Sequence, residues 1–479
     1  MTRRSAVLAT AGFAVLAVAA PSAASAAAPG HWDPLTPSGG NNTDQVGLVR
    51  TPDTRLHVVW KRKNGTNNDL VQTVVEANGK LDAPSTIASN WIGIGAPAVV
   101  RSGNGQLTVI AGATQSLDPT SIASAAAWTS TDNGAHWNLQ PAAVEREGGF
   151  SDFFAAAIGA DGVTPFMANG ATGALYVHRG TDQNVPASNF QGSWGCCAYF
   201  PGLALDSSSH QMIVTWYSNA RGHLGVWAQT VDQSTGAPTG SPTQMPGSVT
   251  KYQGVPSTDE AVQSTPIVAR PGGGVYVAYT SGYPSTTKMD VWKYGSHGAT
   301  VVGTSARNRP EIKHIGITAT PSGRLWAFWS AANRVYARRS NDKGTVWGAV
   351  TSVAGVKRGV ELSEVQGDAQ AGVLDVFGNF AQSPGGSQIY HTQIQPGLTL
   401  AAPARLPAAK KHAVFARLRV TDAGDAVKGV TVKLGSQTAT TNGKGFATFR
   451  FGPEAKAGRL SASATRDGYV GATATVRVK

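Results

Sequence analysis

Runs of hydrophobic residues recur along most of the chain and define one repeated unit. The most regular run in each unit is rich in β-branched and aromatic residues, which is typical of a buried strand. Each run is preceded by another apolar strand and followed by a third, with Gly, Asp or Ser turns between them. The seven runs cover residues 56–60, 107–111, 163–167, 212–216, 275–279, 325–329 and 373–377.

The spacing of these runs predicts an all-β fold. Their first residues lie 48 to 63 positions apart, and repeats of three or four strands at such spacing are typical of the blades of a β-propeller. One small sheet cannot bury both of its faces, whereas several sheets packed around an axis can. We therefore expect a β-propeller over residues 31–398, with seven blades and with residues 31–35 adding a strand to the last one. A ring of six blades with one unit outside it is the alternative.

Two octapeptides carry a sharper pattern, S-x-D-x-G-x-x-W, and each follows a third strand. Its fixed positions are Ser130, Asp132, Gly134 and Trp137 in the second repeat, and Ser340, Asp342, Gly344 and Trp347 in the sixth. Asp can accept backbone N–H groups in its own turn, Gly supplies a positive φ, and Trp can pack back between sheets. The pattern resembles the Asp-box (BNR) hairpin of the sialidase superfamily of propellers. The resemblance implies a structural role for these residues on the outer rim, away from any chemistry.

The aromatic repeats stop near Pro396, and the segment 399–412, rich in Ala, Pro and Lys, is predicted to be a linker. Short alternating strands follow at 414–420, 429–434, 445–451, 459–465 and 472–478. The stretch around Asp422 to Val432, with Thr440 to Gly445, resembles bacterial Ig-like domains of the invasin/adhesin kind. The resemblance implies a small β-sandwich over residues 413–479 with no chemistry of its own.

The N-terminal segment is typical of an export signal. Arg3 and Arg4 precede an apolar run over 6–20, and Pro21 and small residues with an Ala-x-Ala site at 24–26 follow it. This order predicts a signal peptide over residues 1–26 and a secreted, extracellular protein. The apolar run is shorter than the ~20 residues that span a bilayer, and no later segment is long and apolar enough, so we expect no membrane span.

The positive charge is unevenly distributed. The chain has 40 Lys and Arg against 28 Asp and Glu, a net charge of +12. Residues 405–479 hold 14 of these basic residues and 4 of the acidic ones, whereas residues 1–404 hold 26 and 24. The repeat region is therefore close to neutral, and the basic C-terminal segment is expected to bind an anionic cell-wall polymer or polysaccharide.

Candidate chemistry lies in the loops that lead into the first strand of each repeat, here called the axial loops, because propellers bind ligands on their axis. Five of the seven carry a carboxylate. The candidate catalytic residues are Glu260, Glu311, Asp152 and Tyr199, and the candidate ligand-binding residues are Asp44, Trp91, Trp194, Tyr199, Arg221, His314 and Glu364. Together they predict a central acidic cluster with aromatic walls, suited to a sugar.

Two adjacent cysteines, Cys196 and Cys197, stand in the fourth axial loop and are the chain's only cysteines. In a secreted protein they are expected to be oxidised. Their Cα atoms are held about 3.8 Å apart by the peptide bond, which is closer than in ordinary disulfides. A vicinal disulfide would form a rigid apolar platform for a sugar face; two free thiols or pairing between chains are the alternatives.

The resemblance to sialidases implies three arginines around a substrate carboxylate and a Tyr–Glu nucleophile pair, for which Tyr199 and Glu260 are the candidates. The family's Arg-Ile-Pro motif is missing: Arg50, the nearest first-strand arginine, is followed by Thr51 and Pro52. Arg62, Arg221 and Arg334 follow second strands and are the other candidates. Metal-ligating clusters, nucleotide-binding loops and nucleophile elbows are absent from the sequence, so we expect no cofactor, no metal, no nucleic-acid partner, and a monomer.

These observations leave two hypotheses. The first is a secreted carbohydrate-active protein that binds an extracellular glycan at the axial face and hydrolyses it as a sialidase-like glycoside hydrolase. The alternative is a non-enzymatic glycan- or cell-wall-binding propeller, or a protein-docking one, with a basic Ig-like anchoring domain. The sequence leaves open whether the protein is an enzyme.

Overall fold

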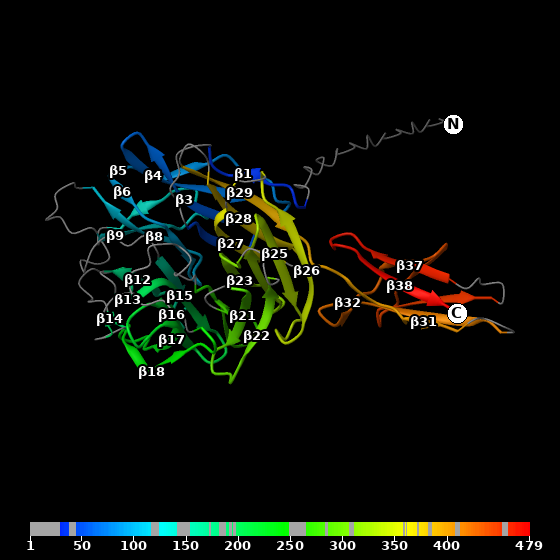
Figure 1. Cartoon of the computed structure of the whole chain (residues 1–479). Helices are drawn as coiled ribbons and strands as arrows, with labels where there is room; N and C mark the ends of the chain where they lie inside the picture. Colours follow the sequence, from blue (N-terminus) through cyan, green and yellow to red (C-terminus); the bar gives the residue numbers. More distant parts are fainter. Residues whose placement is uncertain are drawn as a thin grey trace, which may run out of the picture.

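The computed structural model describes residues 29–37, 45–115, 124–140, 154–171, 174–181, 188–190, 194, 198–248, 265–282, 286–305, 311–357, 360, 362–370, 373–381, 386–407, 412–452 and 458–479. The regular structure of these residues is all strand (Figure 1). No helix in these ranges is both long and apolar enough to cross a membrane.

Residues 33–394 form seven successive antiparallel sheets. The first sheet contains β2 (Gly47–Arg50), β3 (Leu56–Asn64), β4 (Asn67–Val75) and β5 (Ser85–Trp91), and the second contains β7 (Ala98–Arg101), β8 (Leu107–Thr114), β9 (Ser124–Ser130) and β10 (Asn138–Leu139), with β6 (Gly93–Ile94) also paired to β8. The third sheet contains β11 (Phe154–Ile158), β12 (Pro165–Ala171), β13 (Ala174–Arg179) and β14 (Ser188–Asn189). The fourth contains β15 (Ala198–Asp206), β16 (Gln211–Ser218), β17 (Gly225–Val231) and β18 (Pro238–Gln244). The fifth sheet contains β19 (Ile267–Ala269), β20 (Val275–Ser281), β21 (Lys288–Lys293) and β22 (Ala299–Thr304). The sixth contains β23 (Ile315–Ala319), β24 (Leu325–Ser330), β25 (Arg334–Ser340) and β26 (Trp347–Ala354). The seventh contains β27 (Leu362–Gln370), β28 (Val373–Ala381), β29 (Ser387–Ile394) and, from the start of the chain, β1 (Asp33–Pro34).

The first strands of these sheets make a closed ring. β2, β7, β11, β15, β19, β23 and β27 contact one another in this order, and β27 also contacts β2. The predicted closing strand is confirmed, since β1 pairs with β29 and places Asp33 opposite His391. Each apolar run predicted from the sequence lies in the second strand of its sheet, although β12 begins two residues later than expected. We call these seven sheets the ring.

Tryptophan explains much of the packing between the sheets. Trp60, Trp128, Trp216, Trp292 and Trp326 are among the largest side chains that are fully buried, and they lie in the second or third strands of five different sheets. An aromatic side chain of this size removes 150–250 Å² from water, so in each of these five sheets one such residue fills much of the gap to a neighbouring sheet. This is the physical reason for the even spread of Trp along the sequence.

A buried ionic network joins the first and last sheets. Arg50 Nε lies 2.7 Å from Asp368 Oδ1, and Arg50 Nη2 lies 2.7 Å from Asp375 Oδ2. His391 Nε2 lies 3.0 Å from Asp375 Oδ1. Burial raises the pKa of Asp368 despite Arg50. Burial also opposes ionisation of Asp375, but the hydrogen bond to His391 and the charges of His391 and Arg50 outweigh it and hold the pKa of Asp375 below its usual value.

Two further sheets follow the ring, here called the C-terminal sheet pair. One sheet contains β30 (Thr399–Ala401), β32 (Val414–Asp422), β33 (Asp425–Ala426) and β36 (Phe446–Phe451), and the other contains β31 (Arg405–Leu406), β38 (Ala472–Val478), β37 (Gly458–Thr465), β34 (Thr431–Leu434) and β35 (Gln437–Thr440). They share one apolar core that includes Leu418, Val432 and Phe449. The range 399–412, predicted as a linker, contains β30 and β31. Strands of two or three residues are too short for their pairing to be visible in a hydrophobic pattern.

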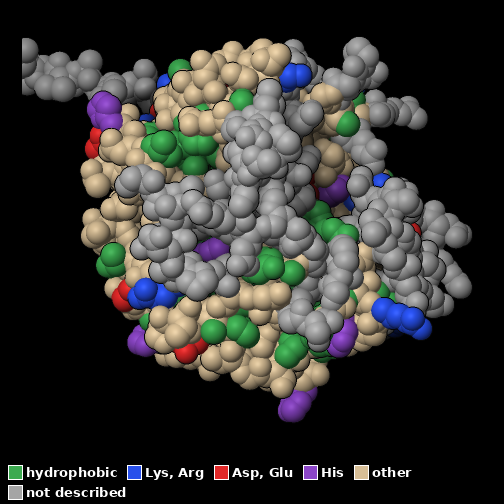
Figure 2. All heavy atoms as spheres, turned by 90° about the vertical axis from the view of Figure 1, so that its left-hand side faces the viewer, with side chains coloured by type: hydrophobic (Ala, Val, Ile, Leu, Met, Phe, Trp, Pro, Cys, Tyr) green, Lys and Arg blue, Asp and Glu red, His purple; other side chains and the backbone are tan. Residues whose placement is uncertain are grey.

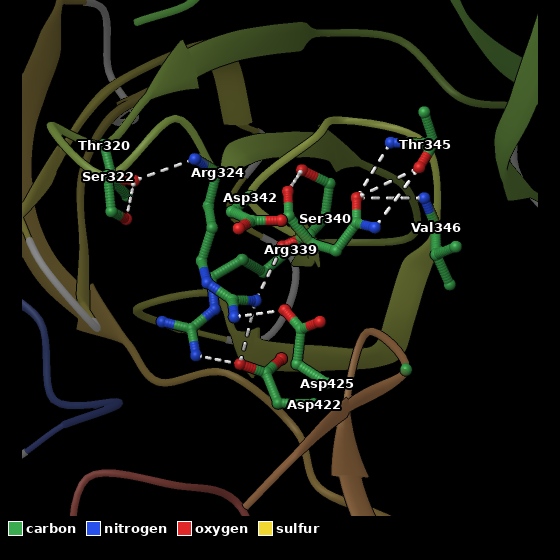
Figure 3. A network of polar contacts seen from close by, with 12 residues as sticks. Thr320, Ser322, Arg324, Arg339, Ser340, Asp342, Thr345, Val346, Asp422 and Asp425 are labelled. Atoms are coloured by element: carbon green, nitrogen blue, oxygen red, sulfur yellow. Dashed lines mark hydrogen bonds and ion pairs between the residues drawn. The ribbon is translucent and has the colours of Figure 1, made fainter. Parts of the chain in front are cut away.

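Ion pairs join the C-terminal sheet pair to the ring (Figure 3). Arg339, only 5% exposed, donates to Asp422, and Arg324 contacts both Asp422 and Asp425. The ring of Tyr469 lies 5.7 Å from the Arg339 guanidinium. Gly397 adds isolated backbone bridges to Ala349 of the ring and to Val470 of the sheet pair. Because a buried guanidinium is stable only when paired, these contacts tie the two parts together.

Candidate functional site

The first strands of the seven sheets line a cavity of about 270 Å³ on the ring axis. Its lining comes from the first halves of these strands and from residues just before some of them, together with Phe328 of β24: 45–48, 98–99, 154–156, 200–203, 265–267, 315–317 and 364–367. The cavity therefore lies toward the end of the ring where the first strands begin. This is the end at which the sequence places the axial loops.

Glycines let the strands approach closely around this cavity. A Cβ atom at Gly316 would lie 2.1 Å from the ring of Phe328. At Gly202 it would lie 2.5 Å from Thr215 Oγ1 and 2.6 Å from the carbonyl oxygen of Thr265. Both positions therefore exclude any larger residue. Much of the cavity wall is consequently backbone and apolar surface, on which a few polar side chains stand out.

Glu364 and His314 are the polar pair at this cavity. Glu364 lies in β27 and lines the cavity, and His314 immediately precedes β23 in the neighbouring sheet. His314 Nδ1 lies 3.7 Å from Glu364 Oε2, and the two side chains are 17% and 14% exposed. The Val365 N–H donates to Glu364 Oε1 over 3.1 Å, and the His314 N–H donates to Ser330 Oγ over 3.1 Å. Two residues that the sequence predicts in separate loops are thus brought together.

Two glutamines of the cavity wall are already used by the ring. The side-chain amide of Gln45 donates to the carbonyl oxygen of Phe154 over 2.8 Å, and Gln366 Oε1 accepts the N–H of Val46 over 2.7 Å. These bonds connect the residues just before β2 to β11 on one side and to β27 on the other. They make the wall rigid, so Glu364 and His314 are the better candidates for contacts with a ligand.

An aromatic cluster lies at the same end of the ring, next to the fourth sheet. The ring of Trp194 stacks on His223 with centroids 3.9 Å apart and an interplanar angle of 5°. Trp227 packs edge-on against Trp194 at 4.8 Å, and its Nε1–H donates to the carbonyl oxygen of His223 over 2.9 Å. Arg221 is exposed in the same β16–β17 turn. Trp194 and Arg221 were predicted, whereas His223 and Trp227 were missed because a turn His and a strand Trp carry no local motif.

The remaining candidates are dispersed. Tyr199 is the second residue of β15 and is half-buried, with its ring 6.3 Å from that of Tyr217. Glu311 is half-buried, three residues before His314. Trp91 departs from the prediction: it ends β5, is 9% exposed and packs edge-on against Trp128 at 5.4 Å, because burial between two sheets gains more contact area than an exposed loop. Asp44, Asp152, Glu260, Cys196 and Cys197 lie outside the described residues.

The candidate arginines do not form a cluster around a substrate carboxylate. Arg50 lies at the far end of β2 in the buried network described above. Arg62 Nη2 lies 2.8 Å from Asp69 Oδ2, and Arg334 Nη2 donates to Ser352 Oγ over 3.0 Å. Each is thus bound to its own sheet or to the adjoining one, and Arg221 is the exposed member of the set.

Both octapeptides lie away from the cavity. They follow β9 and β25, the third strands of their sheets, and in an antiparallel sheet the third strand runs in the direction of the first. These turns therefore lie at the opposite end of the ring from the axial loops. Asp132 and Asp342 cannot reach a ligand in the cavity, in agreement with a structural role.

Figure 2 shows the end of the ring that faces away from the C-terminal sheet pair. Among the described side chains, hydrophobic groups are visible toward the middle of this face, histidines stand both near the middle and along the edge, and Lys, Arg, Asp and Glu lie mostly toward the edge. Within the described ranges, no group of three or more His, Cys, Asp or Glu side chains is placed to hold a metal ion.

No family model matches the chain, and no curated protein sequence matches it. Among solved structures, it is similar to a Penicillium chrysogenum alpha-L-arabinanase complexed with arabinobiose (14% identity, 65% of this chain and 97% of that chain, TM-score 0.44). It is also similar to a PL25 ulvan lyase (10% identity, 76% and 98%, TM-score 0.47) and to the Hadza microbial sialidase Hz136 (12% identity, 73% and 65%, TM-score 0.44). At TM-scores below 0.5, these likenesses transfer no activity to this chain.

Proposed function

We propose that the ring is a seven-bladed β-propeller that binds a glycan where Glu364 and His314 meet the central cavity. The pairing of these two residues carries the proposal: Glu364 lines the cavity, His314 of the adjacent sheet lies against its carboxylate, and the rest of the wall is largely backbone and apolar. Pockets of this composition, with a few convergent polar groups, are typical ligand sites.

The chemistry of a sugar matches this site. Its hydroxyl groups need acceptors and donors, which the carboxylate of Glu364 and the ring nitrogens of His314 supply. Its C–H faces need a flat apolar surface, and the half-buried rings of Trp194 and Trp227 at the same end of the ring can supply one. A ligand that reaches from the axis to this cluster would contact both.

Binding is better supported than hydrolysis. Glycoside hydrolysis by the usual route needs two carboxyl groups about 5–9.5 Å apart, and among the described residues Glu364 is the carboxylate that lines the cavity. Three candidates for a second carboxylate that the sequence offers, Asp44, Asp152 and Glu260, lie outside the described residues. We also propose that the chain is secreted after cleavage near residue 26, that Cys196 and Cys197 form a vicinal disulfide, and that the C-terminal sheet pair is an Ig-like domain.

The test is a glycan array combined with a panel of fluorogenic glycosides, on the wild type and on E364Q and H314A. Both variants should lose at least roughly tenfold in affinity for the glycan found, since a hydrogen bond to a charged group contributes about 1.5–3 kcal/mol. The variant D342N removes a carboxylate from the opposite end of the ring and should bind like the wild type. Undiminished binding by E364Q would overturn the proposed site, and product formation would identify an enzyme.

A further inference from the structure

We infer that the outward face of β31, β38 and β37 is a docking site for a sulfated polysaccharide, independent of the ring cavity. The inference rests on three arginines, Arg405, Arg477 and Arg459, that stand side by side across these strands. We call them the arginine row. The three strands lie in the part of the molecule that carries the C-terminus (Figure 1).

The strand register places the row. Arg405 of β31 lies opposite Arg477 of β38 in a parallel pair, and Arg459 of β37 lies opposite Arg477 in an antiparallel pair. Residues paired in this way point to the same face, and neighbouring strands are about 4.8 Å apart. All three side chains are exposed, whereas the next residues inward, Leu406 and Val478, are buried in the core. Three guanidinium groups thus share one edge of the outer face.

The row is electrostatically unfavourable on its own. Like charges directly opposite each other destabilise a pair of strands, and a single Asp or Glu among them would have relieved the repulsion. The described carboxylates of this domain lie elsewhere: Asp422 and Asp425 are bound by arginines of the ring, and Asp467 stands in the turn at the other end of β37 and β38. An arrangement that repels itself in isolation is stabilised by a bound anion.

The spacing and the surrounding residues favour sulfate esters on a sugar chain. Arginine binds oxyanions through two parallel N–H groups. A sulfate ester has three terminal oxygens, so one group can bridge two neighbouring arginines, whereas a carboxylate or a phosphodiester has two. Beyond the row, the same outward face continues with Ser461 opposite Thr475 and Ser463 opposite Thr473. These hydroxyls can exchange hydrogen bonds with sugar hydroxyls along the polymer.

The full-length protein should be tested for binding to dextran sulfate, with uncharged dextran as the blank. The variant R405Q/R459Q/R477Q removes the row. The matched control, R417Q/R419Q/R450Q, removes three arginines from the outward face of the other sheet, where Arg417 and Arg419 flank the ring of Phe446. Both variants have the same net charge, and thermal melting verifies that each is folded.

The row variant should bind dextran sulfate at least roughly tenfold more weakly, since three exposed ion pairs together contribute about that much. The control variant should stay within about threefold of the wild type, and wild-type binding should weaken as salt is added. Equal losses in the two variants would mean that only total charge matters and would overturn the inference, as would an unaffected row variant. Tighter, row-dependent binding of polyphosphate or duplex DNA would assign the face to a phosphate polymer instead. E364Q should retain dextran sulfate, so this result is separate from the test of the ring cavity.

Discussion

The two octapeptides share one sequence pattern and one place in their sheets, yet different side chains close their turns. In the first, Asp132 Oδ1 accepts the N–H of His136 over 2.9 Å and the hydroxyl of Ser130 over 2.8 Å. In the second, the neighbouring residue Asn341 takes this role, and its Oδ1 accepts the N–H groups of Thr345 over 2.9 Å and Val346 over 3.2 Å. The prediction that the Asp holds its own turn is therefore confirmed for Asp132 and wrong for Asp342.

The serines differ in the same way. Ser130 Oγ accepts the N–H of Gly134 over 2.9 Å, within its own turn. Ser340 Oγ instead accepts the N–H of Leu325 in the adjacent strand over 2.8 Å. Asp342 contributes its backbone carbonyl, which accepts from Arg270 Nη1 over 2.8 Å. The second turn is thus held by its surroundings as much as by its own residues.

The partners of the two turns explain the difference. The first turn faces the neighbouring sheet, where the amide of Gln72 donates to the carbonyl oxygen of Gly134. The second adjoins the C-terminal sheet pair: Arg339, just before it, is paired with Asp422, and a Cβ on Gly348, just after it, would lie 3.1 Å from the backbone nitrogen of Ala423. The turn is held by its own residues in one sheet, and in the other it adjoins a docking surface for the C-terminal sheet pair. Figure 3 shows this second case.

The largest effect is expected at the docking surface. The side chains of Arg339 and Asp422 are 5% and 4% exposed, so R339A leaves a buried carboxylate with Arg324 as its remaining cation. Breaking a buried ion pair costs about 3–5 kcal/mol, and we expect about 3 kcal/mol because Arg324 stays. Urea unfolding followed by Trp fluorescence measures it. The matched variant T129A, just before the first octapeptide, should lose about 1 kcal/mol for the hydrogen bond with Gln140. Equal losses of unfolding free energy in R339A and T129A would contradict the inference that Arg339 holds the C-terminal sheet pair against the ring.

A smaller effect is expected in the second octapeptide, where replacing Asn341 should destabilise the protein more than replacing Asp342. N341A removes the acceptor of two backbone N–H groups in a residue that is 8% exposed, which should cost about 1–2 kcal/mol. D342A removes no side-chain bond of the turn and should stay within about 0.5 kcal/mol of the wild type. The free energy of unfolding of each variant decides the matter. A larger loss for D342A would mean that the Asp acts in both turns after all.

The regular parts of the fold could be predicted because they depend on local periodicity. The seven second strands follow from continuous apolar runs rich in β-branched and aromatic residues, and the closing strand β1 was expected because a ring of sheets needs a strand from the start of the repeat region beside its last sheet. His314 was found because it immediately precedes a first strand, and Glu364 because the sequence assigned it to a loop leading into one, although it lies inside β27. The distance between them was not predictable, since it depends on two sheets meeting at the axis.

Contacts between distant segments account for what was missed. Arg339 lies 83 positions from Asp422, and no local pattern distinguishes it from a solvated arginine. Asn341 looks like a variable position of the octapeptide, and only its hydrogen bonds reveal that it replaces the Asp. The arginine row depends on a parallel pairing of β31 with β38, at opposite ends of the C-terminal sheet pair in sequence. Such features can be recognised only once the tertiary structure is known.

The smallest difference should appear in how the stability of the protein depends on acidic pH, through the carboxyl group of Asp132 in the first turn. The backbone N–H of His136, its side chain and the hydroxyl of Ser130 hold the pKa of Asp132 below its usual range. A carboxyl whose pKa is lowered by folding adds stability above its unfolded-state pKa of about 3.9, and this stability is lost as the pH falls below that value. Between pH 5 and pH 2, unfolding free energies should therefore decrease more steeply for the wild type than for D132N, which has no carboxyl to protonate. The two curves should approach each other as the pH falls toward 2. Parallel curves would show that Asp132 is not held by its turn in solution, and the contrast with Asn341 would then lose its basis.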